Sequence, residues 1–420
     1  MTSFEGQGRS VVTDPSELLP VDRYREFVFR ALPRPQPIEL RVGDTLGLTL
    51  ADDVFAEEAL PAFANSAMDG YAVRAADVAA ADQDAPVEVQ VVGEAAAGGS
   101  SPPHVGEGQA VRIMTGAPVP SGADAVVPVE LTSGSGATVA IYVAPSVGAN
   151  VRPVGDDVAR GQKLVSAGTR LGPAHIGLLT AIGAGVVRCF PAPRVVVIST
   201  GDELVSGQRD LGPGQIRDSN GPMLAAMVRQ AGGAAYAVGP IRDDRGALGA
   251  AIEENLGHAD MVIMSGGVSA GAHDHVEDVL TQLGDVAKFK VAMRPGMPQV
   301  VGRVRGVPVL GLPGNPVSAF VSFEVFVRPA LRVLQGRRDL LRPMVTAALS
   351  EAVVSAEHKR TYLRVRLSRQ EGHWVATPTG HQGSHAITSI ADADGLAEVP
   401  EDVTKLDAGE PVRVHLLIEV

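Results

Sequence analysis

The chain has 420 residues, of which 45% are hydrophobic and 20% are charged. This length exceeds one ordinary core and predicts two to four domains at roughly 150 residues each, and the composition excludes a disordered or low-complexity chain. The net charge of −12 argues against sequence-independent binding of nucleic acid, which needs a broad basic surface.

Cysteine content and hydropathy indicate the cellular compartment in which the protein is expected. The single cysteine, Cys189, excludes an internal disulfide and a cysteine-rich zinc site. The N-terminal stretch MTSFEGQGRSVVTDP lacks an apolar segment of signal-peptide length, and no run of about 18 apolar residues occurs in the chain. We therefore expect a cytoplasmic protein with neither a membrane nor a nucleic acid as partner.

The first part of the chain predicts one helix followed by short strands. Residues 20–32 place Val21, Tyr24, Phe27 and Val28 at helical spacing, which is typical of an amphipathic helix. The stretch 86–152 is rich in Val, Gly and Pro, and we expect it to form a small β-rich domain. Its candidate strands lie at 87–94, 109–114, 124–130 and 137–143.

Strand and helix patterns alternate between residues 194 and 334. Predicted strands lie at 194–199, 235–239, 261–264, 288–293 and 307–311, and predicted helices at 220–231, 244–256, 274–283 and 316–334. This alternation predicts right-handed crossovers and a mainly parallel sheet with helices on both faces. From residue 339 onward the pattern is β again, which indicates a small barrel or sandwich.

Three loops follow predicted strands of the α/β region, at 199–203, 265–271 and 312–316. In an open parallel sheet, ligands bind at this carboxyl edge. Glycines allow the backbone to approach a phosphate, and the helix start behind them offers free N–H groups. The loops match neither the Walker nor the dinucleotide fingerprint, so a tight turn remains the alternative. Asn315-Pro316 also suits a helix N-cap and first turn.

Carboxylates cluster at the same loop ends: Asp202, Glu203, Asp243, Asp244 and Asp274. A pair of carboxylates beside a phosphate-binding loop would suit Mg²⁺, which takes hard oxygen ligands; a solvated charge or a helix cap is the alternative for each. Basic residues follow at Lys288, Lys290 and Arg294, and the two lysines would share one face of a strand. The residues alone therefore predict an α/β domain that binds a phosphorylated ligand with a divalent metal.

Six short motifs occur in order along the chain. They are NSAMDGYA at 65–72, RIMTGAPVP at 112–120, STGDEL at 199–204, SGGVS at 265–269, LPGNPVS at 312–318 and GHQGSH at 380–385. This ordered set resembles the molybdopterin molybdenumtransferases, the family that includes bacterial MoeA and the E domain of gephyrin. The resemblance runs from about residue 16 to the end of the chain.

The resemblance implies a multidomain α/β plus β fold and a homodimer. Its segments would be an elongated discontinuous domain at 16–60 and 153–190, an inserted β-rich domain at 61–152, a mainly parallel α/β sandwich domain that binds molybdopterin at 191–338, and a C-terminal β-barrel at 339–420. It also places the active cleft between the α/β domain of one subunit and the inserted domain of the other.

The resemblance further implies roles for individual residues of these motifs. The catalytic positions would be Asp69, Thr115, Asp157, Glu203 and Lys290, and Asp243 and Asp274 would bind Mg²⁺. The ligand-binding positions would be Thr200, Gly201, Asp202, Ser265, Gly266, Gly267, Ser269, Arg294, Pro298, Pro313, Gly314, Asn315, Arg360 and Ser384. A tight turn is the alternative for Asp69-Gly70, and a turn hydroxyl for Thr115.

Two departures from the family pattern stand out. The family often reads Lys-Pro-Gly-Lys-Pro where this chain has Arg294-Pro295-Gly296-Met297-Pro298. Arg294 keeps a positive charge and Met297 does not, which predicts weaker binding of molybdate. His275 follows Asp274 where a tyrosine is common, so we expect a different rim near the metal.

The implied reaction joins molybdate to adenylated molybdopterin with release of AMP, the last step of molybdenum cofactor synthesis. The protein would align the two substrates, which is proximity catalysis, and other proteins of that synthesis are expected partners. Two alternatives stay open: adenylylation of molybdopterin, which a single related α/β domain performs, and a pterin-binding scaffold without turnover. The first does not need residues 16–190 and 339–420.

Overall fold

The computed structural model describes residues 18–99, 101–134, 136–267 and 275–418. The chain divides into two compact units. Unit 1 comprises Met1–Ile38, Gly47–Ala51 and Arg188–Val420, and unit 2 comprises Glu39–Leu46 and Asp52–Val187. The sequence predicts four segments, whereas the contacts divide the chain into two units. The boundaries of the four segments stay a prediction.

Unit 2 is built on a six-stranded sheet in the order β8-β5-β7-β6-β10-β9. Tyr71 and Val73 pack into one apolar cluster and Ala72 into another, because successive side chains of a strand point to opposite faces. The strands predicted between 86 and 152 are confirmed. The sheet comprises β5 (Gly70–Val73), β6 (Val87–Ala95), β7 (Gln109–Ile113), β8 (Ala125–Pro128), β9 (Thr132–Ser133) and β10 (Thr138–Ile141).

Shorter elements complete unit 2. Strand β4 pairs with β11, and β3 with β12. The bounds are β3 (Val54–Phe55), β4 (Asn65–Ser66), β11 (Val151–Arg152), β12 (Lys163–Val165) and α2 (Pro173–Ala181). Three more strands lie near the points where the chain passes between units: β1 (Ile38–Arg41), β2 (Thr49–Leu50) and β13 (Val186–Phe190).

Unit 1 contains a second six-stranded sheet, in the order β17-β14-β18-β22-β21-β19. The first four strands pair in parallel, and β21 pairs antiparallel with both β22 and β19, which confirms a mainly parallel sheet. Their bounds are β14 (Arg194–Thr200), β17 (Ala234–Ile241), β18 (Met261–Ser265), β19 (Gly284–Lys290), β21 (Pro298–Val304) and β22 (Val307–Leu312). The strand predicted at 288–293 begins and ends earlier, and β21 was not predicted.

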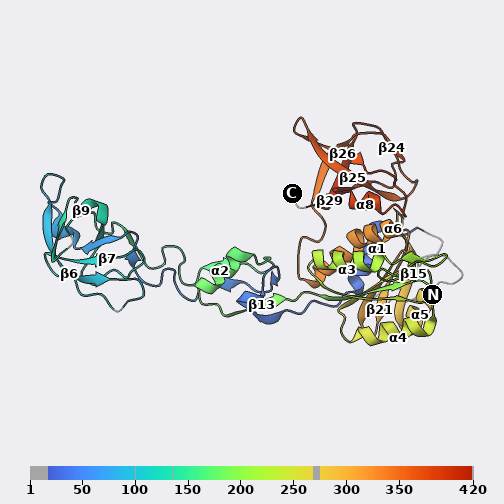
Figure 1. The fold of residues 1–420 in the computed structure, drawn as a ribbon, viewed down its shortest axis with the longest axis horizontal. Helices are drawn as coiled ribbons and strands as arrows, with labels where there is room; N and C mark the ends of the chain where they lie inside the picture. The colour runs from blue at the N-terminus through green and yellow to red at the C-terminus, as the bar shows by residue number, and fades with distance from the viewer. Residues whose placement is uncertain (1–17, 100, 135, 268–274, 419–420) are drawn as a thin grey trace. The chain divides into compact units, whose positions relative to one another are not determined.

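Helices cover both faces of this sheet (Figure 1). Val195 and Val197 of β14 pack with α1, α3, α6 and α7, whereas Val196 and Ile198 pack with α4 and α5. A strand buried on both faces reads as a continuous apolar run, which is why residues 194–199 were recognisable. The helices are α1 (Val21–Ala31), α3 (Asn220–Gln230), α4 (Arg245–Leu256), α5 (His275–Leu283), α6 (Pro316–Ser322) and α7 (Arg328–Leu334).

Helix α1 packs on elements that lie far away in the sequence. Its predicted apolar side is buried. The Tyr24 hydroxyl donates to the carbonyl of Val300 at 3.1 Å, and its ring meets that of Phe326 edge-on at 4.7 Å. Burial of one such aromatic side chain contributes roughly 1.5–3 kcal/mol.

The helix predicted at 316–334 is present but is not regular throughout. A π-helical turn, Phe323–Val327, separates α6 from α7. All five of its residues are buried, so the wider turn lies inside unit 1.

The C-terminal part of unit 1 is a closed five-stranded barrel, as predicted. Neighbouring strands pair in the spatial order β25-β26-β23-β29-β27. Strand β27 also pairs with β25, which closes the barrel. Val365, Ala376, Val399 and Val414 fill the interior. The bounds are β23 (Met344–Leu349), β25 (Arg360–Gln370), β26 (His373–Pro378), β27 (Gly395–Val399) and β29 (Pro411–Leu416), with β20 (Met293–Arg294) added beside β25.

Small elements flank these layers in unit 1. They are β15 (Leu204–Val205), β16 (Ile216–Arg217), β24 (Val353–Val354), β28 (Lys405–Leu406) and α8 (Thr388–Ala391). No helix among the described residues is long and apolar enough to cross a membrane.

Candidate functional site

The three loops at the carboxyl edge of the parallel strands line one cavity of about 1400 Å³. They follow β14, β18 and β22, which are neighbours in the sheet. The structure therefore brings together twelve of the predicted site residues around this cavity. They are Thr200, Gly201, Glu203, Asp243, Ser265, Gly266, Gly267, Lys290, Pro298, Pro313, Gly314 and Asn315.

Close packing of these loops depends on Gly266. Its φ is +95°, and a Cβ atom at this position would lie 2.3 Å from the carbonyl oxygen of Thr200. Any larger residue would therefore push apart the loops that follow β14 and β18. A backbone that approaches this closely is what a glycine permits.

Several carboxylates line the cavity. Asp243, Glu203 and Asp218 all line it, and the Thr200 hydroxyl donates to Oδ1 of Asp243 at 2.6 Å. The backbone N–H of Asp243 donates to Oδ1 of Asp202 at 3.3 Å. Asp202 thus supports the site from outside the cavity lining.

These donors fit Mg²⁺ in one particular way. Among the described residues there is no group of three or more His, Cys, Asp or Glu side chains placed to hold a metal. Mg²⁺ is usually held by one or two carboxylates together with substrate phosphates and water, and Asp243 beside the glycine loops matches that mode. A cage made of protein ligands alone does not fit.

Basic and aromatic groups also line the cavity. Lys288 forms an ion pair with Glu277 at 3.1 Å, and both line the cavity together with Lys290 and Arg23. Phe289 also lines it and stacks on Phe27 of α1, with 5.2 Å between the ring centroids. The cavity therefore offers cations for oxyanions and aromatic rings beside them.

The GHQGSH loop comes from the barrel and contacts the loop that follows β22. The Asn315 amide donates to the Ser384 hydroxyl at 3.1 Å, and the Val317 N–H donates to the Ser384 carbonyl at 3.1 Å. His385, the next residue, lines the cavity. The loop thus closes one side of the site, which the sequence motif alone did not reveal.

Arg364 supports this loop from below and was not predicted from the sequence. It is only 1% exposed, and its guanidinium reaches the carbonyls of His381 and Gly383 and the Ser389 hydroxyl. Burial, together with the nearby Arg294 cation, lowers the pKa of Arg364 to about 10. Arg364 is one of four arginines in β25, so the sequence pattern did not single it out.

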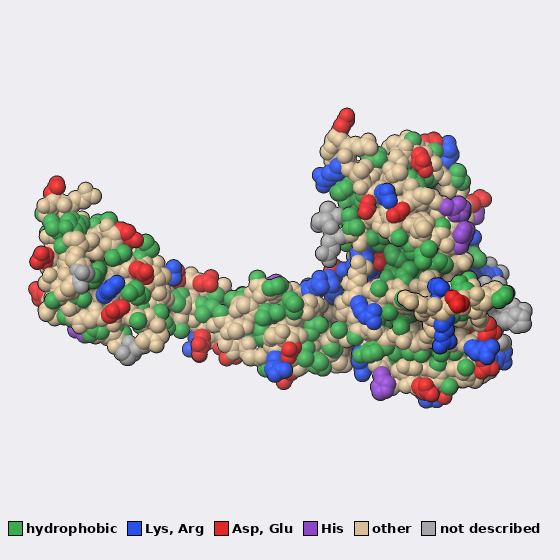
Figure 2. All heavy atoms as spheres, in the orientation of Figure 1, with side chains coloured by type: hydrophobic (Ala, Val, Ile, Leu, Met, Phe, Trp, Pro, Cys, Tyr) green, Lys and Arg blue, Asp and Glu red, His purple; other side chains and the backbone are tan. Residues whose placement is uncertain are grey.

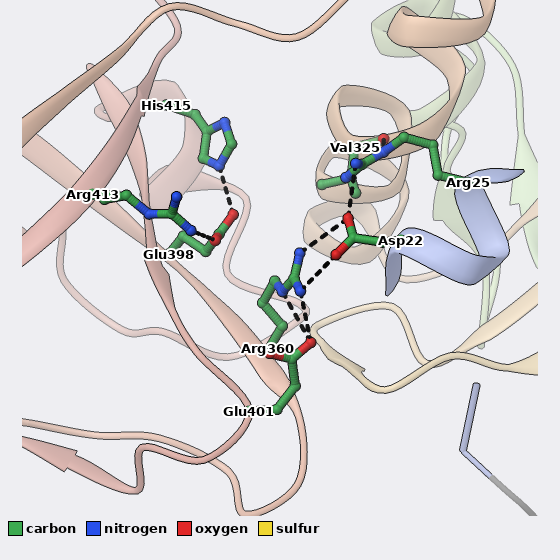
Figure 3. Close-up of polar contacts among 8 residues, drawn as sticks. All are labelled: Asp22, Arg25, Val325, Arg360, Glu398, Glu401, Arg413 and His415. Atoms are coloured by element: carbon green, nitrogen blue, oxygen red, sulfur yellow. Dashed lines mark hydrogen bonds and ion pairs between the residues drawn. The ribbon is translucent and has the colours of Figure 1, made fainter. Parts of the chain in front are cut away.

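Arg360 is not among the residues that line the cavity, and the binding role implied for it stays a prediction. Its guanidinium contacts Asp22 of α1 at 2.9 Å and Glu401 at 3.0 Å (Figure 3). Arg25 adds a bond of 2.9 Å to the same Asp22 carboxylate. This network joins α1 to the barrel.

Three further predicted positions lie outside the cavity lining or outside the described residues. Arg294 is exposed and is absent from the cavity lining, although Met297 and Pro298 of the same turn do line it. Ser269 and Asp274 fall in the segment 268–274, which lies outside the described residues. Their roles therefore stay predictions.

The predicted residues of unit 2 form one clear contact. Oδ1 of Asp69 accepts bonds from the backbone N–H of Thr115 at 2.7 Å and from its hydroxyl at 2.8 Å. These bonds, the backbone bond first, hold the pKa of Asp69 below its usual value, so the exposed carboxylate stays ionised. Asp157 is exposed, and its N–H donates to the carbonyl of Leu60 at 3.0 Å.

The segment Asp218-Ser219-Asn220 also lines the cavity and was not predicted. Oδ1 of Asp218 accepts the N–H of Gly221 at 2.9 Å in the first turn of α3. Polar residues before a helix usually indicate only a cap, so the sequence pattern does not distinguish this segment from an ordinary helix start.

Charges on the visible face are mixed. Figure 2 shows acidic and basic side chains interspersed over that face, without a broad basic area. A small anionic ligand would therefore depend on the local cations of the cavity.

Fold and site together define a class: a multidomain protein with an α/β ligand-binding domain and a C-terminal barrel. Three family models match the chain. They are the MoeA N-terminal region (domain I and II) at 19–183, the probable molybdopterin binding domain at 196–333 and the MoeA C-terminal region (domain IV) at 346–417. The chain belongs to the MoeA family.

The sequences of named relatives align with this chain over most or all of their length. A Mycobacterium tuberculosis (strain CDC 1551 / Oshkosh) protein named molybdopterin molybdenumtransferase 2 is 44% identical over 400 residues, which cover 94% of this chain and 98% of the relative. The Bacillus subtilis (strain 168) molybdopterin molybdenumtransferase is 36% identical over 386 residues, covering 90% and 89%. A crystal structure of a molybdopterin biosynthesis MoeA protein from Pyrococcus horikosii has a TM-score of 0.82 and 37% identity, covering 96% of this chain and 100% of that one.

Proposed function

We propose that this chain is a molybdopterin molybdenumtransferase, which inserts molybdate into adenylated molybdopterin and releases AMP. The observation that carries the proposal is the cavity of about 1400 Å³, which joins glycine loops, carboxylates and cations in one site. The relatives that cover almost the whole chain and bear this name support it.

Each part of the cavity has a proposed role. The glycine loops at Gly266 and Gly314 accommodate the phosphates, and Lys290 holds oxyanions by charge-assisted hydrogen bonds. Asp243 and Asp274 would hold Mg²⁺, which supplies charge stabilisation at the phosphate oxygens. The chain itself aligns molybdate with the dithiolene of the pterin and thereby lowers the entropic barrier.

The proposal extends to the assembly. Asp69 and Thr115 of unit 2 would complete the site at unit 1 of a second subunit, so the active species would be a homodimer. We place the reaction in the cytoplasm, where other proteins of molybdenum cofactor synthesis would supply the substrate and accept the product.

Release of AMP from adenylated molybdopterin, measured with and without molybdate and with and without Mg²⁺, tests the function. We expect release that depends on both ions. Formation of adenylated molybdopterin from ATP instead would indicate an adenylyltransferase. Binding of the pterin without AMP release would indicate a scaffold, and either result would overturn the proposal.

A further inference from the structure

The side chain of Asn220 connects two of the glycine loops. Its amide Nδ2 donates to the Ser265 hydroxyl at 2.8 Å and to the Gly314 carbonyl at 2.7 Å. Ser265 ends β18, and Gly314 belongs to the loop after the neighbouring strand β22. One amide group therefore spans the two loops that the proposed function assigns to phosphate binding.

The orientation of this amide follows from chemistry. A backbone carbonyl can only accept a hydrogen bond, so the atom that faces Gly314 must be the NH₂ group. Nδ2 has two hydrogens, and each is used by one loop. Exchange of the amide oxygen and nitrogen would place two acceptors against each other.

The parallel ladder between β18 and β22 ends at the pair Ser265 and Leu312, so the two loops separate from this point onward. The backbone N–H of Gly266 reaches the Leu312 carbonyl at 3.4 Å, which is longer than an ordinary N–H···O bond. Asn220 itself is fixed, because it begins α3, whose Leu224, Ala225 and Val228 are buried in the core. The side chain is thus a bridge from a rigid helix to two glycine-containing turns.

The bridge comes at a cost to stability. Oδ1 of Asn220 is buried and has no hydrogen-bond partner among the described residues. A buried acceptor without a partner is unfavourable, so a residue selected for folding alone would not need this amide. Such a cost is typical of sites where geometry matters for function.

We propose that Asn220 is a positioning residue that sets the spacing of the Ser265 and Gly314 loops for the adenylated substrate. It acts through these loops, which line the same cavity. The inference rests on the proposed function, and it extends the site to a residue that no family motif in this chain singled out.

Asn220→Asp tests the inference. Aspartate keeps the shape and still accepts a bond from Ser265, but its oxygens repel the Gly314 carbonyl. We expect the KM for adenylated molybdopterin to rise at least tenfold, with kcat changed less than threefold, and AMP to bind at least tenfold more weakly in calorimetry with Mg²⁺. Asn220→Ser, which suits the first turn of a helix and is too short to span both loops, gives the same test if Asn220→Asp does not fold.

The matched control is Asn255→Asp. The Asn255 amide donates to the Ala251 carbonyl at 2.8 Å within α4, away from the cavity lining, so its loss affects stability alone. AMP affinity equal to that of the control, once corrected for the folded fraction in thermal melting, would overturn the inference. Wild-type protein that binds AMP but releases none from adenylated molybdopterin would instead refute the proposed function, and AMP affinity would still decide the role of Asn220.

Discussion

Thr200 donates its hydroxyl hydrogen to Oδ1 of Asp243 at 2.6 Å, and the bond fixes that carboxylate beside the glycine loops. Asp244, the next residue, plays a different part, because its carboxylate accepts the N–H of Ala247 at 2.8 Å and caps α4. Two adjacent aspartates thus have separate roles, which allows a paired test.

Asp243→Asn should fold and bind adenylated molybdopterin, because the amide oxygen can still accept from Thr200. It should lose AMP release by on the order of a hundredfold, since a bound metal supplies several kcal/mol of charge stabilisation. The Mg²⁺ dependence of turnover is the measurement. Asp244→Asn is the control, because asparagine is an equally good helix cap; equal losses in both variants would contradict a metal role for Asp243.

Met297→Lys should strengthen molybdate binding. Met297 lines the cavity, and its backbone carbonyl accepts the N–H of Val291 at 2.7 Å, a bond that a change of side chain leaves in place. A charge-assisted bond is worth roughly 1.5–3 kcal/mol, or about ten- to a hundredfold in affinity. Calorimetry with molybdate measures the change. Met297→Leu should bind like the wild type, and unchanged affinity in the lysine variant would show that position 297 does not contact molybdate.

Complementation tests the proposed assembly. Asp69→Asn and Glu203→Gln should each be inactive as homodimers, because each removes a carboxylate of the proposed shared site. Mixing the two chains after dissociation and reassociation should restore part of the AMP release, since each heterodimer would contain one intact site and one site with both changes. Light scattering should give the mass of a dimer at micromolar concentration. A monomer, or heterodimers without activity, would rule out a shared site.

Asp22→Asn should weaken the contact between α1 and the barrel in a pH-dependent way. Burial raises the pKa of Asp22, but the bonds and charges of Arg360 and Arg25 outweigh it and lower the pKa overall. A carboxyl with a lowered folded pKa stabilises the protein above its unfolded pKa of about 3.9, and that stability is lost as the pH falls. The free energy of unfolding of the wild type should therefore exceed that of the variant by about 1 kcal/mol or less at pH 7, and this difference should shrink as the pH falls through the lowered folded pKa.

Urea unfolding at several pH values measures this effect. Asp210 is exposed and forms no ion pair with any described residue, so Asp210→Asn provides the control, with no expected difference in the free energy of unfolding at any pH. A constant difference between wild type and Asp22→Asn across the range would mean that packing, and not the ion pair, is responsible.

Local patterns predicted much of this fold. The apolar run at 194–199 and the helical spacing from Val21 to Ala31 depend on residues close in sequence, and both elements are present. Strand β21 was missed because its hairpin to β22 turns at Arg305-Gly306, with φ of 48° and 87°. Such a turn needs positive φ at both positions, which the usual Asn-Gly pair signals and an arginine does not.

The site was harder to predict than the fold because its side chains meet over long distances. The glycine loops were recognisable as strand ends, and the structure brings them together at one cavity. The contribution of Arg23 and Phe27 of α1 to that cavity depends on packing across the whole of unit 1. The pairing of Arg360 with Asp22, 338 residues away, is likewise absent from any local pattern.

The packing of α1 has a consequence for how the chain folds during synthesis. Tyr24 bonds to the carbonyl of Val300, 276 residues later. Because the ribosome adds about 5–20 residues per second, Val300 is synthesised on the order of tens of seconds after Tyr24. Unit 2 is complete at Val187 and can form first. The amphipathic segment Val21–Ala31 thus leaves the ribosome with its apolar side uncovered, and we expect general chaperones to occupy it until β21 is made.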